Sequence, residues 1–195
     1  FFVLSSSVNT QATIFSFDLR GNDAALALDG ENIGQLIDSN LIAIFSAGPD
    51  ALIDEIFNQT SGRFGINSVG TTVDSSSLID AAGGISEFLT ISFSQRVRLD
   101  TFTLSAFAPG EIASLSIADS LPMLLNGLVA AQDIYNFSNV TLDIGEQLRL
   151  SHVFGNGFSF DRLTVSIVQV SEPGFFILML TGITAVTILR RSKNK

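Results

Sequence analysis

The chain has 195 residues, 19 acidic and 10 basic side chains with a formal charge of −9, and neither cysteine nor tryptophan. This length allows one domain with a substantial core, and a content of 46% hydrophobic against 15% charged residues excludes a highly charged disordered chain. The lack of cysteine excludes disulfides and thiolate metal sites, and the acidic balance argues against nucleic acid as a partner, because phosphates need clustered lysine and arginine.

The basic side chains are unevenly distributed along the chain. Every acidic residue precedes Gly174, so that residues 1–173 carry six basic against nineteen acidic side chains, a net charge of −13. The remainder carries +4, from four side chains in the last six residues: Arg190, Arg191, Lys193 and Lys195. Opposite charges of this size indicate that the two parts of the chain occupy different environments.

The first residues are apolar and are followed by small and polar ones. Phe1–Leu4 is typical of the end of a signal-peptide h-region, and the residues up to Ala12 are suitable for a signal-peptidase site. Residues 1–12 are therefore predicted to be the remnant of a signal peptide. The alternative is that Phe1–Leu4 forms a first strand.

Residues 13–170 are expected to form one all-β domain. Thr13–Leu19 alternates apolar and polar residues, as a half-buried strand does. The same period of two recurs in three further segments: Glu87–Phe93, Ala113–Ile117 and Leu163–Ile167. Within Val97–Phe107 the alternation slips by one residue, which predicts a β-bulge or a switch of face.

Turn residues separate these segments and set their spacing. Many short strands divided by glycine, proline and asparagine favour an antiparallel β-sandwich, either jelly-roll-like or Ig-like. Gly145-Glu146, between Leu142 and Leu148, predicts a hairpin. Two segments could be helical instead: Ile33–Asn40 and Pro49–Phe57.

Three carboxylates fall in one predicted loop-to-strand region: Asp74, Asp80 and Glu87. Oxygen ligands of this kind suit Ca²⁺, although their spacing matches no EF-hand and a solvated acidic surface gives the same pattern. These residues are the candidate calcium ligands, and no other cofactor is predicted.

Signals for catalysis are weak. His152 is the only histidine, and no G-x-S-x-G or H-E-x-x-H motif accompanies it, so that a packed structural histidine is expected. The pairs Asp29/Glu31 and Asp54/Glu55 are expected to be surface carboxylates rather than glycosidase pairs. The chain is therefore predicted not to be an enzyme. Carbohydrate binding is disfavoured by the lack of tryptophan and the single tyrosine, Tyr135.

The C-terminal part contains an uncharged segment, Gly174–Leu189. As a helix its sixteen residues would reach roughly 24 Å, somewhat less than the ~30 Å hydrocarbon core of a bilayer. The basic residues that follow it form the positive-inside pattern of a span that ends in the cytoplasm. A transmembrane helix is therefore predicted over 174–189, with Arg190, Arg191, Lys193 and Lys195 as its stop; a buried core helix is the alternative.

Three residues immediately precede this span: Ser171, Glu172 and Pro173. The order of short motif, hydrophobic span and basic end at 171–195 resembles the PEP-CTERM sorting signal of Gram-negative bacterial envelope proteins, with Ser171 where that family has its first proline. Pro173 also biases Glu172 toward an extended backbone open to a protease. The resemblance implies recognition by an exosortase, removal of the tail and delivery to the cell surface or the exopolysaccharide matrix.

Together these observations predict an exported protein of three parts, namely residues 1–12, the ectodomain 13–170 and the sorting signal 171–195. Its expected partners are an exosortase, the inner membrane as a transient anchor, and exopolysaccharide. A structural or adhesive role at the cell surface or in the matrix is the first hypothesis. The alternative is a secreted glycan-binding module or a carbohydrate-active enzyme on the same scaffold.

Overall fold

The computed structural model describes residues 12–20, 28–48, 55–60, 62–68, 77–82, 84–118, 120–128 and 132–168. These residues form strands and turns, with no helix among them, and every strand pairing is antiparallel. The predicted all-β class is thus confirmed for this part of the chain. The predicted signal-peptide remnant, apart from Ala12, and the segment 171–195 lie outside it.

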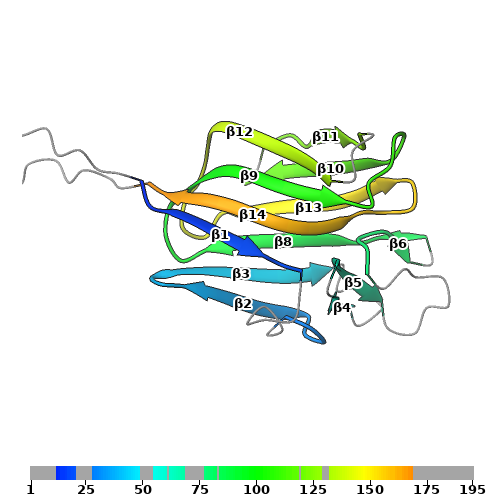
Figure 1. Cartoon of the computed structure of the whole chain (residues 1–195), viewed down its shortest axis with the longest axis horizontal. Helices are drawn as coiled ribbons and strands as arrows, with labels where there is room; N and C mark the ends of the chain where they lie inside the picture. The colour runs from blue at the N-terminus through cyan, green and yellow to red at the C-terminus, as the bar shows by residue number, and fades with distance from the viewer. Residues whose placement is uncertain are drawn as a thin grey trace, which may run out of the picture.

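Two sheets contain most of the strands (Figure 1). The four-stranded sheet has the order β1 (Ile14–Asp18), β14 (Ser159–Ile167), β9 (Val97–Ser105), β12 (Gln132–Leu142). The six-stranded sheet has the order β11 (Met123–Asn126), β10 (Ile112–Ile117), β13 (Gln147–Phe154), β8 (Phe88–Phe93), β3 (Leu41–Gly48), β2 (Ile33–Asp38). Two short hairpins complete the fold: β4 (Glu55–Gln59) with β5 (Phe64–Ser68), and β6 (Ala81–Ala82) with β7 (Ile85–Ser86).

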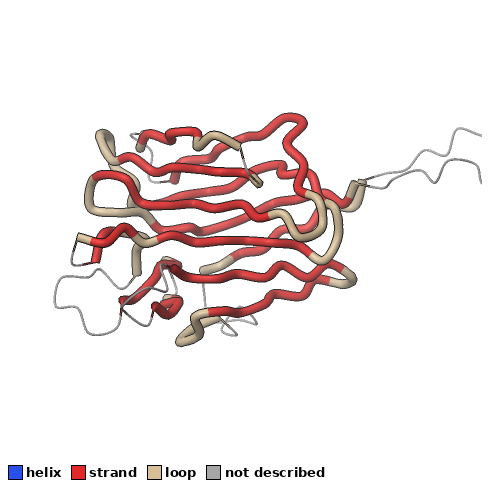
Figure 2. Tube along the Cα trace, turned by 180° about the vertical axis from the view of Figure 1, so that it is seen from behind, coloured by secondary structure: helices blue, strands red, loops and turns tan. Residues whose placement is uncertain are grey.

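The two main sheets form the layers of a β-sandwich-like fold, seen from behind in Figure 2. Alternate residues of each strand enter one common core, as the period of two predicts: Phe15 and Phe17 of β1 are buried, whereas Ile14 is 67% exposed. Leu89, Ile91 and Phe93 of β8 are buried in the same way. Each such side chain contributes about 1.5–3 kcal/mol through its burial, so the alternation itself fixes which face of each sheet turns inward.

The pairing between strands is nested. β1 pairs with β14, β8 with β13, β9 with β12, and β10 with β11. Additional pairings of β9 with β14 and of β10 with β13 join these pairs into the two sheets. β2 and β3 extend the six-stranded sheet beyond β8. The chain therefore folds back on itself as one long ribbon of paired strands.

The irregularity predicted within Val97–Phe107 is a β-bulge at Asp100. On β14 the consecutive residues Thr164 and Val165 pair with Thr101 and Leu99, which leaves Asp100 as the extra residue of β9. Its carboxylate accepts a hydrogen bond from Arg98 Nε at 2.8 Å and another from the hydroxyl of Ser166. The extra residue returns the apolar side chains on both sides of the bulge to the core.

The predicted hairpin at Gly145-Glu146 is wrong. β12 lies in the four-stranded sheet and β13 in the six-stranded sheet, so the turn carries the chain from one layer to the other. Leu142 and Leu148 on either side are both fully buried between the layers. The turn is locally regular, with Glu146 N donating to Asp143 O at 3.0 Å. Local turn chemistry is the same whether a turn joins paired strands or crosses the sandwich.

The helical alternatives are also wrong where the structure describes them. Ile33–Asp38 is strand β2, held in register with β3 by pairs such as Leu36 with Ala43. Glu55–Gln59 is strand β4, so the end of Pro49–Phe57 is extended, while residues 49–54 lie outside the described part. Partner strands supply the backbone hydrogen bonds that a short isolated helix would have to supply itself.

The sandwich has two distinct ends. At the tail end β1 begins and β14 ends, because Ile14 pairs with Ser166, and the turns 94–96 and 143–146 lie there too (Figure 1). At the far end lie the turns 106–111 and 155–158. Residues 77–82 and 84–87 also belong to the far end, since Ile79 bridges to Phe158. Both described termini, residues 12 and 168, lie at the tail end.

Candidate functional site

All residues of the predicted sorting signal and one calcium candidate lie outside the described residues. These are Ser171, Glu172, Pro173, Arg190, Arg191, Lys193, Lys195 and Asp74. Within the described part of the chain there is no helix with the length and apolar character needed to span a bilayer. The predicted span at 174–189 falls beyond it.

Asp80 and Glu87, the other two calcium candidates, lie together at the far end. Glu87 N donates to Asp80 O at 2.8 Å, and Asp80 N donates to Glu87 Oε2 at 2.9 Å. Glu87 is fully buried, and its Oε1 accepts a hydrogen bond from the Ser68 hydroxyl at 2.7 Å. No group of three metal-ligating side chains is found among the described residues, so the calcium site stays a prediction that involves Asp74.

Further buried carboxylates at the far end hold backbone amides. Glu111 is 5% exposed and joins two turns, because Oε2 accepts from Ala108 N at 2.5 Å and Oε1 from Asn156 N at 2.9 Å. Asp133, 1% exposed, accepts a hydrogen bond from Leu128 N at 2.8 Å. These acidic groups act as internal acceptors that fix loops.

His152 is buried beside the same turns. Its side chain is 6% exposed and its Nε2 lies 3.1 Å from Gly155 O, a backbone group. This packing agrees with the structural role expected from the sequence. Asp29, from the carboxylate pair Asp29/Glu31, accepts a hydrogen bond from Gln59 N at 2.8 Å and so also fixes backbone.

A small ion cluster lies across β1 and β14. Asp18 accepts hydrogen bonds from Arg20 Nη2 at 3.2 Å and from Arg162 Nη2 at 2.8 Å. Partial burial by itself raises the pKa of Asp18, but the hydrogen bonds from Arg20 and Arg162 outweigh it and lower that pKa to about 2. Arg20 also lies 3.8 Å from the buried Asp161, which extends the cluster toward the far end.

An apolar groove of about 500 Å³ opens between the layers at the β10–β11–β12 edge. Tyr135 and Phe137 of β12 line it and pack on Phe102, with ring centroids 5.2 and 5.0 Å apart. The Tyr135 hydroxyl donates to Asn126 O at 3.0 Å. Burial, helped by the charge of Asp133, raises the pKa of Tyr135 to about 12, so this hydroxyl stays protonated at neutral pH.

The outward surface of the six-stranded sheet is a second feature, which we call the hydroxyl face. Its outward positions carry hydroxyl and amide side chains among exposed apolar ones such as Ile33, Ile37, Ile44 and Leu124. The hydroxyl and amide side chains are Gln35, Ser46, Thr90, Ser92, Ser114, Ser116, Gln147 and Ser151. One row crosses four strands, because Ser46 pairs with Thr90, Thr90 with Arg149, and Arg149 with Ser116. None of the outward positions on these six strands is acidic.

Arg149 lies at the centre of the hydroxyl face. Its guanidinium carbon is 3.7 Å from the centroid of the Phe88 ring, and its Nε donates to Ser151 Oγ at 3.3 Å. Beside it is a hollow of about 370 Å³, which we call the sheet hollow. Apolar and polar side chains line it together: Ile33, Ile44, Ala47, Phe88, Ser46, Thr90, Ser92 and Gln147.

Neither the groove nor the hydroxyl face was found from the sequence. Residues of the hydroxyl face come from strands far apart in the chain, and the groove forms only where the three strands β10, β11 and β12 are brought together across the two layers. The one available signal was the run of serine and threonine at outward positions of predicted strands, such as Thr90 and Ser92. Comparison with protein-family models, with curated proteins and with solved structures finds no match to this chain.

Proposed function

We propose that this chain is an exported protein of the bacterial cell surface or exopolysaccharide matrix, sorted by an exosortase through residues 171–195. The sandwich would be its ectodomain, with a structural or adhesive and non-enzymatic role. The observation that carries the proposal is the order of Glu172-Pro173, the uncharged segment 174–189 and Arg190-Arg191. Two arguments support it: an uncharged segment followed by arginines is the pattern of a membrane span that ends in the cytoplasm, and the same order resembles the PEP-CTERM sorting signal.

The position of β14 supports this arrangement. The last core strand ends at Ile167, only a few residues before Ser171, and it ends at the tail end together with the start of β1. A short connection would therefore hold the tail end next to the inner membrane before processing, with the far end pointing away. After cleavage the ectodomain would be released to the surface or the matrix.

We further propose that the ectodomain is a jelly roll rather than an Ig-like sandwich. A jelly roll consists of eight strands in two sheets, joined as two Greek keys. The nested pairs β1·β14, β8·β13, β9·β12 and β10·β11 support this assignment. In that description residues 33–86 form an insertion between its first and second strands.

Glycan binding is a second candidate function, favoured by the hydroxyl face. The enzymatic alternative has less support, because glycoside hydrolysis needs two carboxylates facing a cleft. The lining of the apolar groove and that of the sheet hollow contain no carboxylate. The buried carboxylates described above accept hydrogen bonds from backbone amides instead.

The sorting proposal is tested by Pro173→Ala in a host that expresses an exosortase. Without the proline the helix can extend into the cleavage region, so membrane insertion should persist while removal of the tail slows. Pro122→Ala, at an exposed position of the sandwich, is the matched control and should be processed normally. Mass spectrometry of surface-extracted protein is the readout. A surface form that still carries Arg190 to Lys195 in the unaltered chain would contradict the proposal.

A second variant tests the direction of insertion. Replacing Arg190 and Arg191 by Glu reverses the charge that follows the span, and charges flanking a span set its orientation. We expect a loss of surface delivery, measured by the accessibility of the ectodomain to protease on intact cells. Unchanged accessibility would show that these arginines do not set the topology.

A further inference from the structure

We propose that the hydroxyl face binds an anionic polysaccharide, a chain containing uronic acid residues, and that Arg149 on Phe88 recognises its carboxylate. This inference rests on the second candidate function above and names its ligand class. The site is the sheet hollow together with the adjacent Arg149.

The lining of the sheet hollow matches the two surfaces of a sugar ring. A pyranose has an apolar face of C–H groups and an edge of hydroxyl groups. Ile44 and the Phe88 ring supply apolar contact, while Ser46, Thr90 and Gln147 supply hydroxyl and amide groups that can donate and accept hydrogen bonds. The site thus offers partners to both surfaces of one ring.

The repeat of the sheet suits a polymer rather than a single sugar. Neighbouring strands lie about 4.8 Å apart, close to the length of one pyranose unit. The row Ser46, Thr90, Arg149 and Ser116 therefore presents one polar side chain for each successive unit of a glycan lying across the strands. The face has no charged side chain at its outward positions other than Arg149.

The charge of the face selects an anionic ligand. Among the described residues Arg20, Arg96, Arg98 and Arg162 form ion pairs with aspartates, whereas Arg149 forms none. The nearest acidic residue along β13 is Glu146, in the turn before it, and its Oε2 accepts a hydrogen bond from Asp143 N at 2.7 Å. In a chain whose ectodomain is strongly acidic, this face is an exception, and like-charge repulsion keeps an anionic polymer from the rest of the surface.

Stacking on Phe88 prepares Arg149 for this role. The ring holds the guanidinium in place and contributes a cation–π interaction, while leaving N–H groups available to a ligand. A guanidinium donates two parallel hydrogen bonds to a carboxylate, which a lysine in the same place could not do. The Arg149 side chain therefore loses less conformational freedom when the ligand binds.

The test measures binding of an oligogalacturonate to the full chain in nonionic detergent, by isothermal titration calorimetry. The methyl-esterified oligogalacturonate is the ligand control, because it keeps the rings and removes their charge. Arg149→Gln should weaken binding of the acid form by about tenfold or more, the range for loss of a charge-assisted hydrogen bond. Arg63→Gln is the protein control, since Arg63 is also exposed and forms no ion pair among the described residues.

The inference is supported if the acid form binds better than its ester and if Arg149→Gln, but not Arg63→Gln, removes that preference. Phe88→Leu should lower the affinity for both forms, because it takes away the platform and not the charge. Absence of binding, equal binding of acid and ester, or equal effects of the two arginine variants would overturn it.

The calorimetric experiment, taken together with mass spectrometry of the surface-extracted protein, separates this inference from the sorting proposal. A protein that loses its tail and reaches the surface but binds no oligogalacturonate overturns the assignment of the face alone. A protein that binds through Arg149 but keeps its tail overturns the sorting proposal alone. Thermal melts of the variants confirm that each is folded.

Discussion

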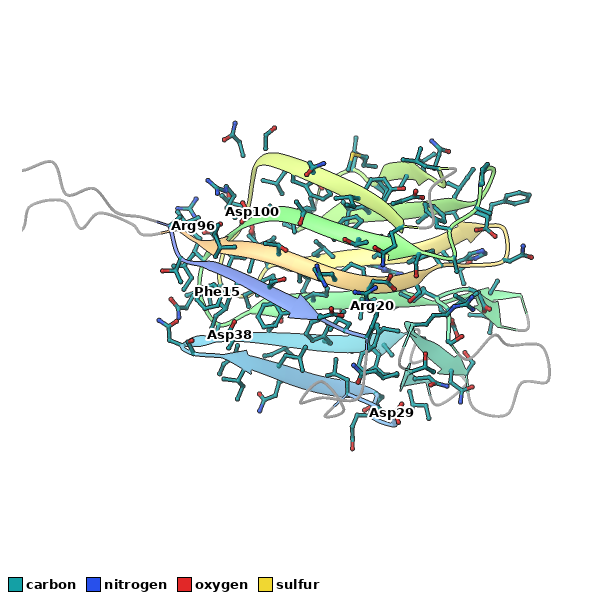
Figure 3. The ribbon with its side chains drawn as sticks, viewed as in Figure 1. Phe15, Arg20, Asp29, Asp38, Arg96 and Asp100 are labelled. Carbon is teal, nitrogen blue, oxygen red and sulfur yellow. The ribbon has the colours of Figure 1, made fainter. Side chains whose placement is uncertain are left out.

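The two ends of the sandwich use their acidic residues in opposite ways. At the far end Glu87, Glu111 and Asp133 are buried and accept hydrogen bonds from backbone amides of neighbouring turns. At the tail end, where Figure 3 labels Arg96 and Asp100, Arg96 pairs with Asp143 at 2.8 Å and Arg98 with Asp100 at 2.8 Å, and these side chains are 20–61% exposed. Carboxylates thus accept hydrogen bonds inside the protein at the far end, whereas at the tail end they form ion pairs that are partly exposed to solvent.

This difference indicates where the fold is rigid. A buried acceptor that is removed leaves donors without partners, which is costly, whereas an exposed ion pair contributes little to stability. The far end is also closely packed, since a Cβ on Gly157 would lie 2.5 Å from Asp80 Cβ. We therefore expect substitutions in the far-end loops to lower the free energy of unfolding more than substitutions in the tail-end loops do.

The largest expected effect is that of Glu87→Ala. It removes the acceptor of Ser68 and of Asp80 N and leaves a cavity, so the free energy of unfolding should fall by about 3–4 kcal/mol. Glu87→Gln is the control, because its amide oxygen can accept from Asp80 N while its NH₂ donates to Ser68, and it should lose less than half as much. Urea denaturation gives both values. Equal losses would mean that charge rather than hydrogen-bond geometry matters here.

Glycines at the two ends provide the next comparison. Gly157 and Gly145 both have positive φ, 97° and 88°, but Gly145 has open space where a Cβ would be. Gly145→Ala should cost about 1 kcal/mol from backbone strain alone, and Gly157→Ala about 2–3 kcal/mol because a clash with Ile79 and Asp80 is added. Thermal melts of the two variants measure the difference. Similar shifts in Tm would show that the residues around Gly157 move to make room for an added methyl group.

The decrease in the free energy of unfolding at low pH should depend in part on the carboxylate of Asp18. Its folded pKa of about 2 lies below the ordinary value of 3.8, so the cluster with Arg20 and Arg162 stabilises the folded chain above about pH 4. That contribution is lost as the pH falls toward 2, and Asp18→Asn should remove it at every pH. NMR titration of the carboxyl carbon measures the pKa directly. A value near 3.8 would mean that the arginines do not hold this carboxylate in solution.

The smallest effect is expected at the tail end. Arg96→Ala breaks its exposed ion pair with Asp143 and should change the free energy of unfolding by about 0.5 kcal/mol or less. A double-mutant cycle with Asp143→Ala isolates the coupling between the two side chains. A coupling well above this range would show that the tail end is as constrained as the far end.

The local features of the fold were predictable from the sequence. The inward faces of β1 and β8 follow from the alternation in Thr13–Leu19 and Glu87–Phe93, and the slip near Asp100 gave the bulge. These features depend on the burial of side chains within one strand, which the order of residues encodes directly.

The pairing of strands was not predictable in the same way. Leu142 and Leu148 are equally apolar in a hairpin and in a crossing between layers, so the sequence around Gly145 does not distinguish the two. Ile33–Asp38 is a strand because β3 lies beside it, not because of its own pattern. Asp80 and Glu87, expected in one loop-to-strand region, lie together, but the sequence does not show that Glu87 is buried and accepts a hydrogen bond from Asp80 N. The hydroxyl face depends on the registers of four separate pairings, which no single segment contains.

The nested pairing has a consequence for how the protein is made. Because Ile14 pairs with Ser166, the first described strand cannot find its partner until nearly the whole sandwich sequence is available. Contacts so distant along the chain form late and slowly. The strand that closes the sandwich, β14, is also the one nearest to the proposed membrane span, so folding would be completed at the membrane surface.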